Sequence, residues 1–163
     1  MKLVSDTSEY ALRAVIWLIQ DPTRSQTTRQ TAKGTRTPPD YMSKVLQLLT
    51  KAGLVRGRRG IGGGFRLAGK PSEITVWDVV NGADPVQRIR TCPLCLAKHG
   101  TDLCPLHCGI NEATLRRKAA FSRTNAVDLL DGRSRSVPLG IRIPRTRLPF
   151  RRNPAMVRSA EAP

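Results

Sequence analysis

The 163-residue sequence lacks any apolar run long enough to cross a membrane. Its longest run, Ala14 to Ile19, is far shorter than the roughly 20 residues that a transmembrane helix needs. The N-terminus shows neither the hydrophobic core nor the small-residue cleavage site of a secretory leader. We therefore expect a cytoplasmic protein without a membrane partner, built as one domain with appendages.

Acidic residues are scarce. The chain has 12 aspartates and glutamates against 28 lysines and arginines, which gives a net charge of +16 and a pI near 11.2. Residues 132–163 hold eight arginines and a single acid, Glu161, so this tail carries +7 and the body before it is itself basic at +9. Such a charge predicts an anionic partner, and nucleic acid is the commonest one.

The sequence also lacks the residue groupings of an enzyme. It shows no acid–base pair, no nucleophile constellation and no phosphate-binding loop. The glycine-rich run GIGGGF, residues 60–65, is too short and wrongly placed for a dinucleotide fingerprint. We therefore predict a protein that is not an enzyme.

Cysteine is confined to one seventeen-residue stretch, CPLCLAKHGTDLCPLHC. Clustered cysteines in a cytoplasmic protein bind metal or do redox chemistry more often than they form structural disulfides. Thiolates suit both zinc and iron–sulfur clusters, although proline follows the first cysteine of each pair, where zinc knuckles usually carry a tight glycine turn. A thiol–disulfide switch without a cofactor is a third interpretation. The stretch holds Cys92, Cys95, Cys104 and Cys108 together with both histidines of the chain, His99 and His107.

Three helices are predicted in the first third of the chain. Asp6 and Glu9 have the spacing of a capping box, and the apolar pattern that follows predicts a helix ending before Pro22. A short polar helix at 28–33 should be closed by Gly34. Pro38 and Pro39 suit the start of a third helix, which Gly53 would end. Two short helices joined by a tight turn predict a helix-turn-helix.

A basic β-hairpin follows the second helix of this motif. Residues 54–60 and 65–68 read as strands around a glycine turn, and Arg56, Arg58, Arg59 and Arg66 surround that turn. A basic hairpin directly after a recognition helix is typical of the wing of a winged helix-turn-helix, while an ordinary solvated hairpin is the alternative. The fold class predicted is therefore mainly α with a small β-hairpin wing.

The rest of the chain divides into four parts. Residues 74–80 predict a short helix in which Trp77 packs into the core, which completes a DNA-binding domain at 1–83. Residues 84–109 form a cysteine-rich sensor loop, and 132–163 form a disordered basic tail. A long helix at 110–131, with a restart near Asn125 and Asp128, has too little apolar surface for its own core, so we expect it to pair with a second copy. Its apolar side holds Ile110, Ala113, Ala120, Val127 and Leu130.

The candidate DNA contacts come from three places. The start of the recognition helix should enter the major groove, the start of the helix before it should meet phosphates, and the wing should reach a minor groove or flanking phosphates. For Tyr41, packing against the core is an equal alternative. The candidates are Thr27, Thr28, Arg29, Asp40, Tyr41, Ser43, Lys44, Arg56, Arg58, Arg59, Gly62 and Gly63.

Several stretches together resemble the Rrf2 family of bacterial transcriptional regulators. They are KLVSDTSEYALRAV, PPDYMSKVLQLLTKAGLVRGRRGIGGGFRLA, EITVWDVV and CPLH, and the resemblance spans residues 1 to about 131. It implies a dimeric winged-helix factor, usually a repressor, and many members hold an iron–sulfur cluster that responds to iron supply, nitric oxide or oxidants. Thr31 replaces the family's usual aliphatic residue, so its helix is expected to pack less firmly.

The resemblance favours a [2Fe–2S] or [4Fe–4S] cluster over zinc in the cysteine stretch. It does not fix the ligands, because relatives usually offer three cysteines at wider spacing. Cys92 and Cys104, each before a Pro-Leu pair, are the leading ligands, with Cys95 or Cys108 as the third. Further candidate ligands are His107 and, by the family pattern, Glu9 from the partner subunit, although Glu9 could simply cap its helix with Asp6.

The sequence thus predicts a homodimeric, operator-binding repressor that senses iron, nitric oxide or redox state. Within the same class, a zinc-binding or cofactor-free repressor is the alternative. An iron–sulfur electron-transfer or assembly protein that docks acidic partners is the alternative from another class.

Overall fold

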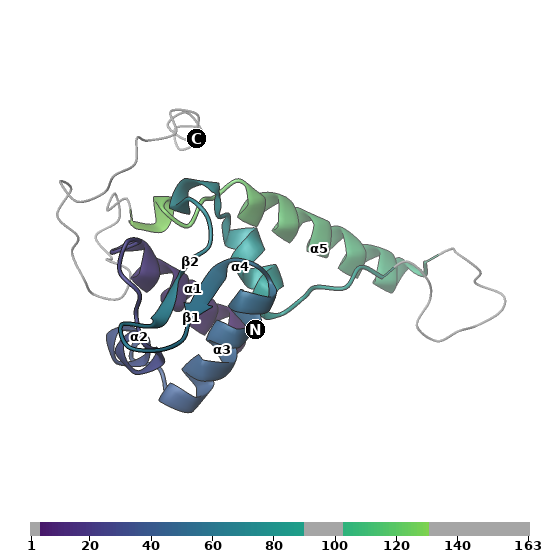
Figure 1. The fold of residues 1–163 in the computed structure, drawn as a ribbon. Helices are drawn as coiled ribbons and strands as arrows, with labels where there is room; N and C mark the ends of the chain where they lie inside the picture. Colours follow the sequence, from purple (N-terminus) through teal and green to yellow (C-terminus); the bar gives the residue numbers. More distant parts are fainter. Residues whose placement is uncertain (1–3, 90–102, 131–163) are drawn as a thin grey trace.

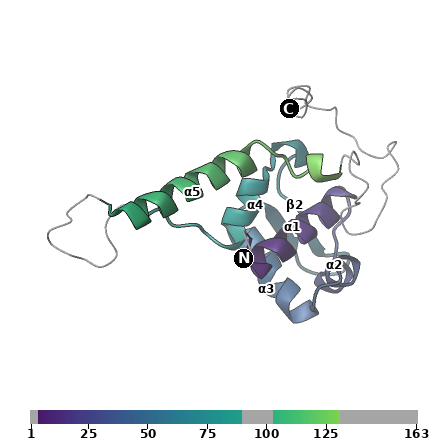
Figure 2. The ribbon, with the colours of Figure 1, turned by 180° about the vertical axis from the view of Figure 1, so that it is seen from behind.

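The computed structural model describes residues 4–89 and 103–130, which form a helical body with one long helix extending from it (Figures 1 and 2). The described part of the chain is mainly α with a two-stranded antiparallel hairpin, as predicted. Its elements are α1 Asp6–Ile19, α2 Thr28–Thr35, α3 Pro39–Lys51, β1 Val55–Arg58, β2 Gly64–Leu67, the 3-10 turn η1 Pro71–Glu73, α4 Val76–Ala83, α5 Pro105–Ser122 and η2 Asp128–Leu130.

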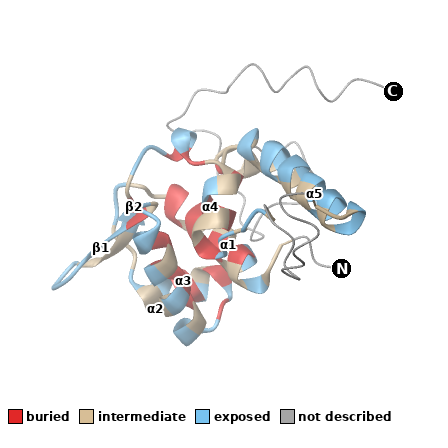
Figure 3. Ribbon diagram, turned by 90° about the vertical axis from the view of Figure 1, so that its right-hand side faces the viewer, coloured by how far each residue is buried: buried red, intermediate tan, exposed pale blue. Residues whose placement is uncertain are grey.

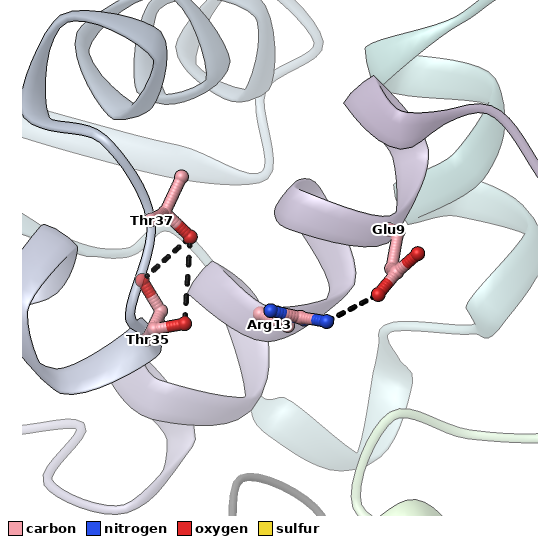
Figure 4. Close-up of polar contacts among 4 residues, drawn as sticks. All are labelled: Glu9, Arg13, Thr35 and Thr37. Carbon is pink, nitrogen blue, oxygen red and sulfur yellow. Dashed lines mark hydrogen bonds and ion pairs between the residues drawn. The ribbon is translucent and has the colours of Figure 1, made fainter.

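Helix α1 is capped at its N-terminus by Ser5. The Ser5 hydroxyl accepts a hydrogen bond from the Ser8 backbone N–H at 3.2 Å, which satisfies one of the free amides of the first turn. The predicted capping box of Asp6 and Glu9 is therefore wrong. Asp6 is already the first helical residue, and Glu9 forms an ion pair with Arg13 one turn later (Figure 4). Serine and aspartate are equally good caps, so the sequence pattern alone could not separate these two starts.

The core lies where α1, α2, α3, α4 and the hairpin meet. Helix α1 packs against α2, α3, α4 and β2, and the buried residues gather on the sides of these elements that face one another (Figure 3). Removing this apolar surface from water supplies the main driving force for folding. The cluster consists of Ala11, Ala14, Val15, Leu18, Ile19, Ala32, Met42, Val45, Leu46, Leu49, Val55, Leu67, Ile74, Val79, Ala83 and Ala126. Trp77, predicted to pack into the core, is half-buried on α4 and does not belong to this cluster.

Helix α2 runs through Gly34 rather than ending before it, which corrects the predicted boundary. The helix extends to Thr35, and Arg36 follows as its C-cap in the left-handed region with a φ of 53°. A Cβ on Gly34 would lie 2.5 Å from the ring of Trp17 on α1. This glycine is therefore required by the close approach of two helices.

The turn between α2 and α3 is held by threonine hydroxyls. Thr35 Oγ1 donates to the Thr31 carbonyl at 2.7 Å and lies 3.1 Å from Thr37 Oγ1 (Figure 4). Thr31, expected to weaken the packing of α2, is fully buried, and its hydroxyl donates to the Thr27 carbonyl at 3.1 Å. Helix α3 then begins at Pro39, as predicted.

The hairpin is anchored at its base. Its register runs from Val55 opposite Leu67 to Arg58 opposite Gly64, and the Val55–Leu67 pair at the base is buried. Backbone hydrogen bonds of 2.9 and 2.7 Å also join Phe65 to Gln26, just before α2. The hairpin is thus fixed beside the helix-turn-helix, with its tip standing clear of the helices (Figure 3).

Helix α5 starts earlier and ends earlier than the predicted 110–131. Val127 and Leu130, predicted on its apolar side, therefore lie beyond the helix and pack against the core of the body. Pro105 occupies its first turn, where the missing N–H costs nothing, and the helix breaks after Ser122 with a 3-10 turn following, as expected. Residues 124–126 pair with 74–76, with Val76 N–H donating to the Thr124 carbonyl and Ala126 N–H to the Ile74 carbonyl, both at 2.8 Å. In the described residues, no helix combines the length and apolar composition that crossing a bilayer requires.

Candidate nucleic-acid interface and cysteine segment

Helix α3 presents a polar face to solvent. Residues Asp40, Lys44 and Gln47 recur at intervals of three or four, so they lie on one side of the helix, and all three are exposed. The opposite side is buried in the core through Met42, Val45, Leu46 and Leu49. Ser43 is half-buried at the edge of the exposed face. The core therefore holds α3 in one orientation, with side chains that can meet base edges pointing outward.

Tyr41 points toward α1. Its hydroxyl lies 2.8 Å from Thr7 Oγ1, and its ring meets the Tyr10 ring edge-on with 5.2 Å between centroids. Of the two interpretations of Tyr41, these contacts favour packing.

The start of α2 combines a closed cap with an exposed cation. The Thr27 hydroxyl accepts from the Gln30 N–H at 3.2 Å, and the Gln30 side-chain oxygen accepts from the Thr27 N–H at 2.8 Å. This capping box commits the Thr27 side chain to the helix itself. Thr28 is half-buried and Arg29 is exposed, so Arg29 is the residue of this turn best placed to meet a phosphate.

The predicted wing arginines of the hairpin are exposed to solvent. Arg56, Arg58 and Arg59 are all exposed. Gly62 has a φ of 73°, and a Cβ on Gly63 would lie 2.4 Å from the Arg58 carbonyl oxygen, so the turn itself requires both glycines. Their predicted contact with DNA stays a prediction.

The helix-turn-helix and the hairpin carry charge of almost one sign, positive. Residues 22–72 hold eleven cations and a single acid, Asp40. Every one of the eleven is exposed, so the segment of helix-turn-helix and hairpin places its cations in solvent, and Lys70 also forms an exposed 3.5 Å ion pair with Glu73. A surface of this kind attracts a polyanion. The cations are Arg24, Arg29, Lys33, Arg36, Lys44, Lys51, Arg56, Arg58, Arg59, Arg66 and Lys70.

Part of the cysteine segment lies at the start of α5. Cys104 is the N-cap residue, and its Sγ lies 3.0 Å from His107 Nδ1. Cys108 is exposed one turn further on. Cys92, Cys95 and His99 lie outside the described residues. Within the described ranges, no three His, Cys, Asp or Glu side chains are grouped as a metal site.

Glu9, the candidate ligand from a partner subunit, is an exposed residue of α1. Its carboxylate pairs with Arg13 (Figure 4), and the Arg13 guanidinium also lies 5.7 Å from the centre of the Tyr10 ring. The ion pair uses one carboxylate oxygen of Glu9, Oε1.

Comparison with known proteins now bears on this arrangement. A family model, Rrf2, described as an iron-dependent transcriptional regulator, matches residues 4–132. The chain belongs to the Rrf2 family. It is accordingly a transcriptional regulator with a DNA-binding fold, and Rrf2 proteins are regulators rather than enzymes, as the sequence predicted.

Individual Rrf2 relatives agree. The HTH-type transcriptional regulator NsrR of Bacillus subtilis is 30% identical over 136 residues, which cover 80% of this chain and 90% of NsrR. Among solved structures, CymR, the global cysteine regulator of B. subtilis, matches with a TM-score of 0.62 at 21% identity, over 82% of this chain and 100% of CymR. IscR of T. potens matches with a TM-score of 0.64 at 21% identity, over 82% of this chain and 89% of IscR. Both structures confirm the predicted winged-helix fold.

Two exposed residues of this Rrf2 chain were missed by sequence reasoning. Gln47 continues the exposed face of α3 one turn beyond Lys44, and the helical spacing from Asp40 could have identified it. Arg36 lies in the turn between α2 and α3, and its left-handed backbone carried no signal in the sequence. Both belong with the candidate DNA contacts.

Proposed function

We propose that this Rrf2 regulator is a homodimeric repressor that places α3 in the major groove of a two-fold symmetric operator and holds an iron–sulfur cluster in its cysteine segment. The observation that carries the DNA-binding half is the exposed face of α3 beside a hairpin, in a segment with eleven exposed cations and one acid. A helix that is packed on one side and polar on the other fits the major groove.

Dimerisation is supported by α5. This 18-residue helix has no buried residue, and its N-terminal part extends away from the body in both views (Figures 1 and 2). Leu106 and Ile110, which are 68% and 44% exposed, share a side with Ala113 and Ala120 because their spacing follows the helical repeat. A second copy of α5 laid along this side would bury the exposed side chains of Leu106 and Ile110.

The side chains of Cys104 and His107 are of types that bind iron–sulfur clusters. Cys104 and His107 already converge, and thiolate and imidazole are both established ligands of such clusters. Cys92, Cys104 and either Cys95 or Cys108 would hold the cluster, with His107 and the partner's carboxylate at position 9 as further candidates. When bound, such a cluster supplies redox chemistry and reactivity toward oxidants and nitric oxide. Zinc, or no cofactor, is the alternative for the same thiols.

Helix α5 connects Cys104 and Cys108 to the DNA-binding domain. From Cys104 to Lys118, α5 spans about 21 Å at 1.5 Å per residue. Near that far end the Lys118 ammonium lies 5.7 Å from the centre of the Trp77 ring on α4, and α4 packs against α1 and α3. Because Cys104 and Cys108 lie at the end of α5 opposite this contact, a change at them acts along α5 or directly on the partner subunit.

Two measurements test the proposal separately. The purified full chain should retard an operator duplex in a gel shift, and the logarithm of its affinity should fall linearly with the logarithm of salt concentration. Salt-insensitive binding would contradict the DNA-binding interface. The cluster is tested by anaerobic purification with an absorption spectrum and analysis of iron, sulfide and zinc. A colourless protein with one zinc per chain would overturn the cluster and support the zinc alternative, while leaving the DNA-binding half intact.

A further inference from the structure

An isoleucine stands at the tip of the hairpin with nothing around it. Ile61 is 106% exposed, the highest value among the large apolar side chains of the described residues. The others that are exposed, Leu106, Ile110 and Leu115, all lie on α5. Ile61 alone is on the surface that carries the arginines of the hairpin, with Arg58 and Arg59 just before it.

The turn that carries Ile61 is built otherwise of glycines. Gly60 and Gly62 have φ values of 94° and 73°, and the Gly63 N–H donates to the Gly60 carbonyl at 2.9 Å, which closes a four-residue turn. Of the four residues 60–63, only Ile61 has a side chain beyond hydrogen. The turn closes through glycine backbone alone and needs no particular side chain at position 61.

The base of the hairpin fixes where this tip points. Phe65 exchanges two backbone hydrogen bonds with Gln26, and a Cβ on Gly57 would lie 3.2 Å from the Phe65 ring, so β1 and β2 are closely packed there. Gln26 immediately precedes Thr27, the cap of α2. The tip is therefore held at a fixed position relative to α2 and α3. A residue that contacts DNA next to the site of α3 needs such a fixed position.

We propose that Ile61 enters the minor groove beside the major-groove site of α3 and selects A·T over G·C base pairs there. This inference rests on the proposed operator binding. The minor groove of B-DNA is about 6 Å wide, which admits a tip bearing one side chain. Its floor is smooth at A·T pairs, whereas guanine adds its 2-amino group at G·C pairs. An isoleucine side chain has no acceptor for that amino group and would meet it as an obstacle.

Apolar side chains are used in this way by proteins that bind the minor groove, where isoleucine and similar residues can press between base steps. Arg58 and Arg59 precede the tip on the β1 side of the hairpin and would meet phosphates beside the groove, which holds the apolar side chain against the bases. Full exposure in the free protein leaves the whole side-chain surface available for burial on binding.

The test uses two substitutions at one position and three base pairs. A binding duplex is first selected from a randomised pool with the wild-type chain, and hydroxyl-radical footprinting locates the minor-groove positions protected by the hairpin. Those positions are then synthesised as A·T, G·C or inosine·cytosine. Inosine·cytosine lacks the 2-amino group, so it matches A·T in the minor groove and G·C in the major groove. Affinities are measured for the wild type, Ile61→Ser and Ile61→Leu.

The expected wild-type order is A·T equal to inosine·cytosine, with both binding on the order of tenfold more tightly than G·C. Ile61→Ser should lose affinity for the A·T duplex by a similar factor and should no longer discriminate. Ile61→Leu keeps an apolar side chain and should retain both. Because Ile61 contacts nothing in the free protein, both variants should fold as the wild type does.

Three results would overturn the inference. Ile61→Ser could bind and discriminate as the wild type does, inosine·cytosine could behave as G·C, or the footprint could show no minor-groove protection beside the α3 site. Each leaves operator binding intact. Failure of the wild-type chain to select any duplex would instead refute the proposed function, and the role of Ile61 with it.

Discussion

At the scale of single residues, several side chains of the DNA-binding domain are positioned by partners distant in the sequence. Gly34 lies under the Trp17 ring, Tyr41 pairs with Thr7, and the buried Ser8 hydroxyl donates to the Val80 carbonyl at 3.4 Å. These contacts join α1 to α2, α3 and α4 in turn. The orientation of the helix-turn-helix therefore depends on α1, although α1 itself supplies no predicted DNA contact.

Gly34→Ala should destabilise the protein. The added methyl would lie 2.5 Å from the Trp17 ring, which is closer than atoms can approach, and overpacking of this kind costs about 1–3 kcal/mol. Alanine's better helix propensity, worth up to about 1 kcal/mol, offsets part of the loss. Urea denaturation at a fixed protein concentration measures the change in the free energy of unfolding. Gly69→Ala is the matched control, because a Cβ there meets nothing within 4 Å, and equal stability of both variants would contradict the contact.

Tyr41→Phe separates packing from base reading. Removing the hydroxyl leaves Thr7 without its 2.8 Å partner and should cost about 1 kcal/mol of stability. Operator affinity should change less than about threefold, whereas removing a side chain that reads a base would cost about tenfold or more. Denaturation and fluorescence anisotropy measure the two quantities. Thr7→Val should cost a similar amount, and the double variant should cost less than the sum of the two.

At the scale of elements, helical periodicity and turn residues predicted α1, α3 and the hairpin, because one-sided burial leaves a repeating apolar pattern. The end of α2 was mispredicted, since the need for Gly34 comes from Trp17 on another helix, and tertiary contacts leave no local signal. The exposed face of α3 was predictable for the same reason as its buried face. Exposure of Ile61 and the Cys104–His107 contact were not, because both depend on where backbone turns place side chains.

Lys44, on the exposed face of α3, should contribute to DNA binding. Lys44→Ala removes a cation that faces solvent, so it should weaken operator affinity by about 1–3 kcal/mol and lower the salt slope by about one for each phosphate that Lys44 neutralises. Anisotropy titrations over a range of salt concentrations measure both. Arg123→Ala removes an exposed cation at the end of α5 and should change neither. Equal slopes for Lys44→Ala and the wild type would show that Lys44 does not meet a phosphate.

At the scale of the whole molecule, the described part of the regulator consists of a packed body and a long helix, α5, that has no buried residue. The body has a continuous core, while α5 contacts it mainly near its own C-terminal end, through α4 and the paired residues 74–76 and 124–126. Cys104 and Cys108, the two described cysteines of the proposed sensor segment, lie at the opposite end of α5. Coupling between signal and DNA therefore depends on what α5 packs against, and in the proposed dimer a second copy would supply that surface.

Ile110→Glu should prevent dimerisation. It places a carboxylate on the side of α5 that holds Leu106, Ala113 and Ala120, and burying an unpaired charge against a second copy costs several kcal/mol. Sedimentation velocity should show a dimer for the wild type, as proposed, and a monomer for the variant. Operator affinity should fall by more than about a hundredfold, because one recognition helix then contacts one half-site.

The control for this change lies on the same helix. Glu112→Gln removes a charge from the exposed Glu112–Arg116 pair, whose 3.7 Å contact contributes at most about 1 kcal/mol. It should leave the dimer and its operator affinity as they are. If Ile110→Glu also stays dimeric, the subunits pair through another surface. If it becomes monomeric while circular dichroism and denaturation show an intact body, the apolar side of α5 is the dimer interface. The two recognition helices are then spaced by the helix that begins at Cys104, which is the geometric condition for a cysteine-linked signal to change operator affinity.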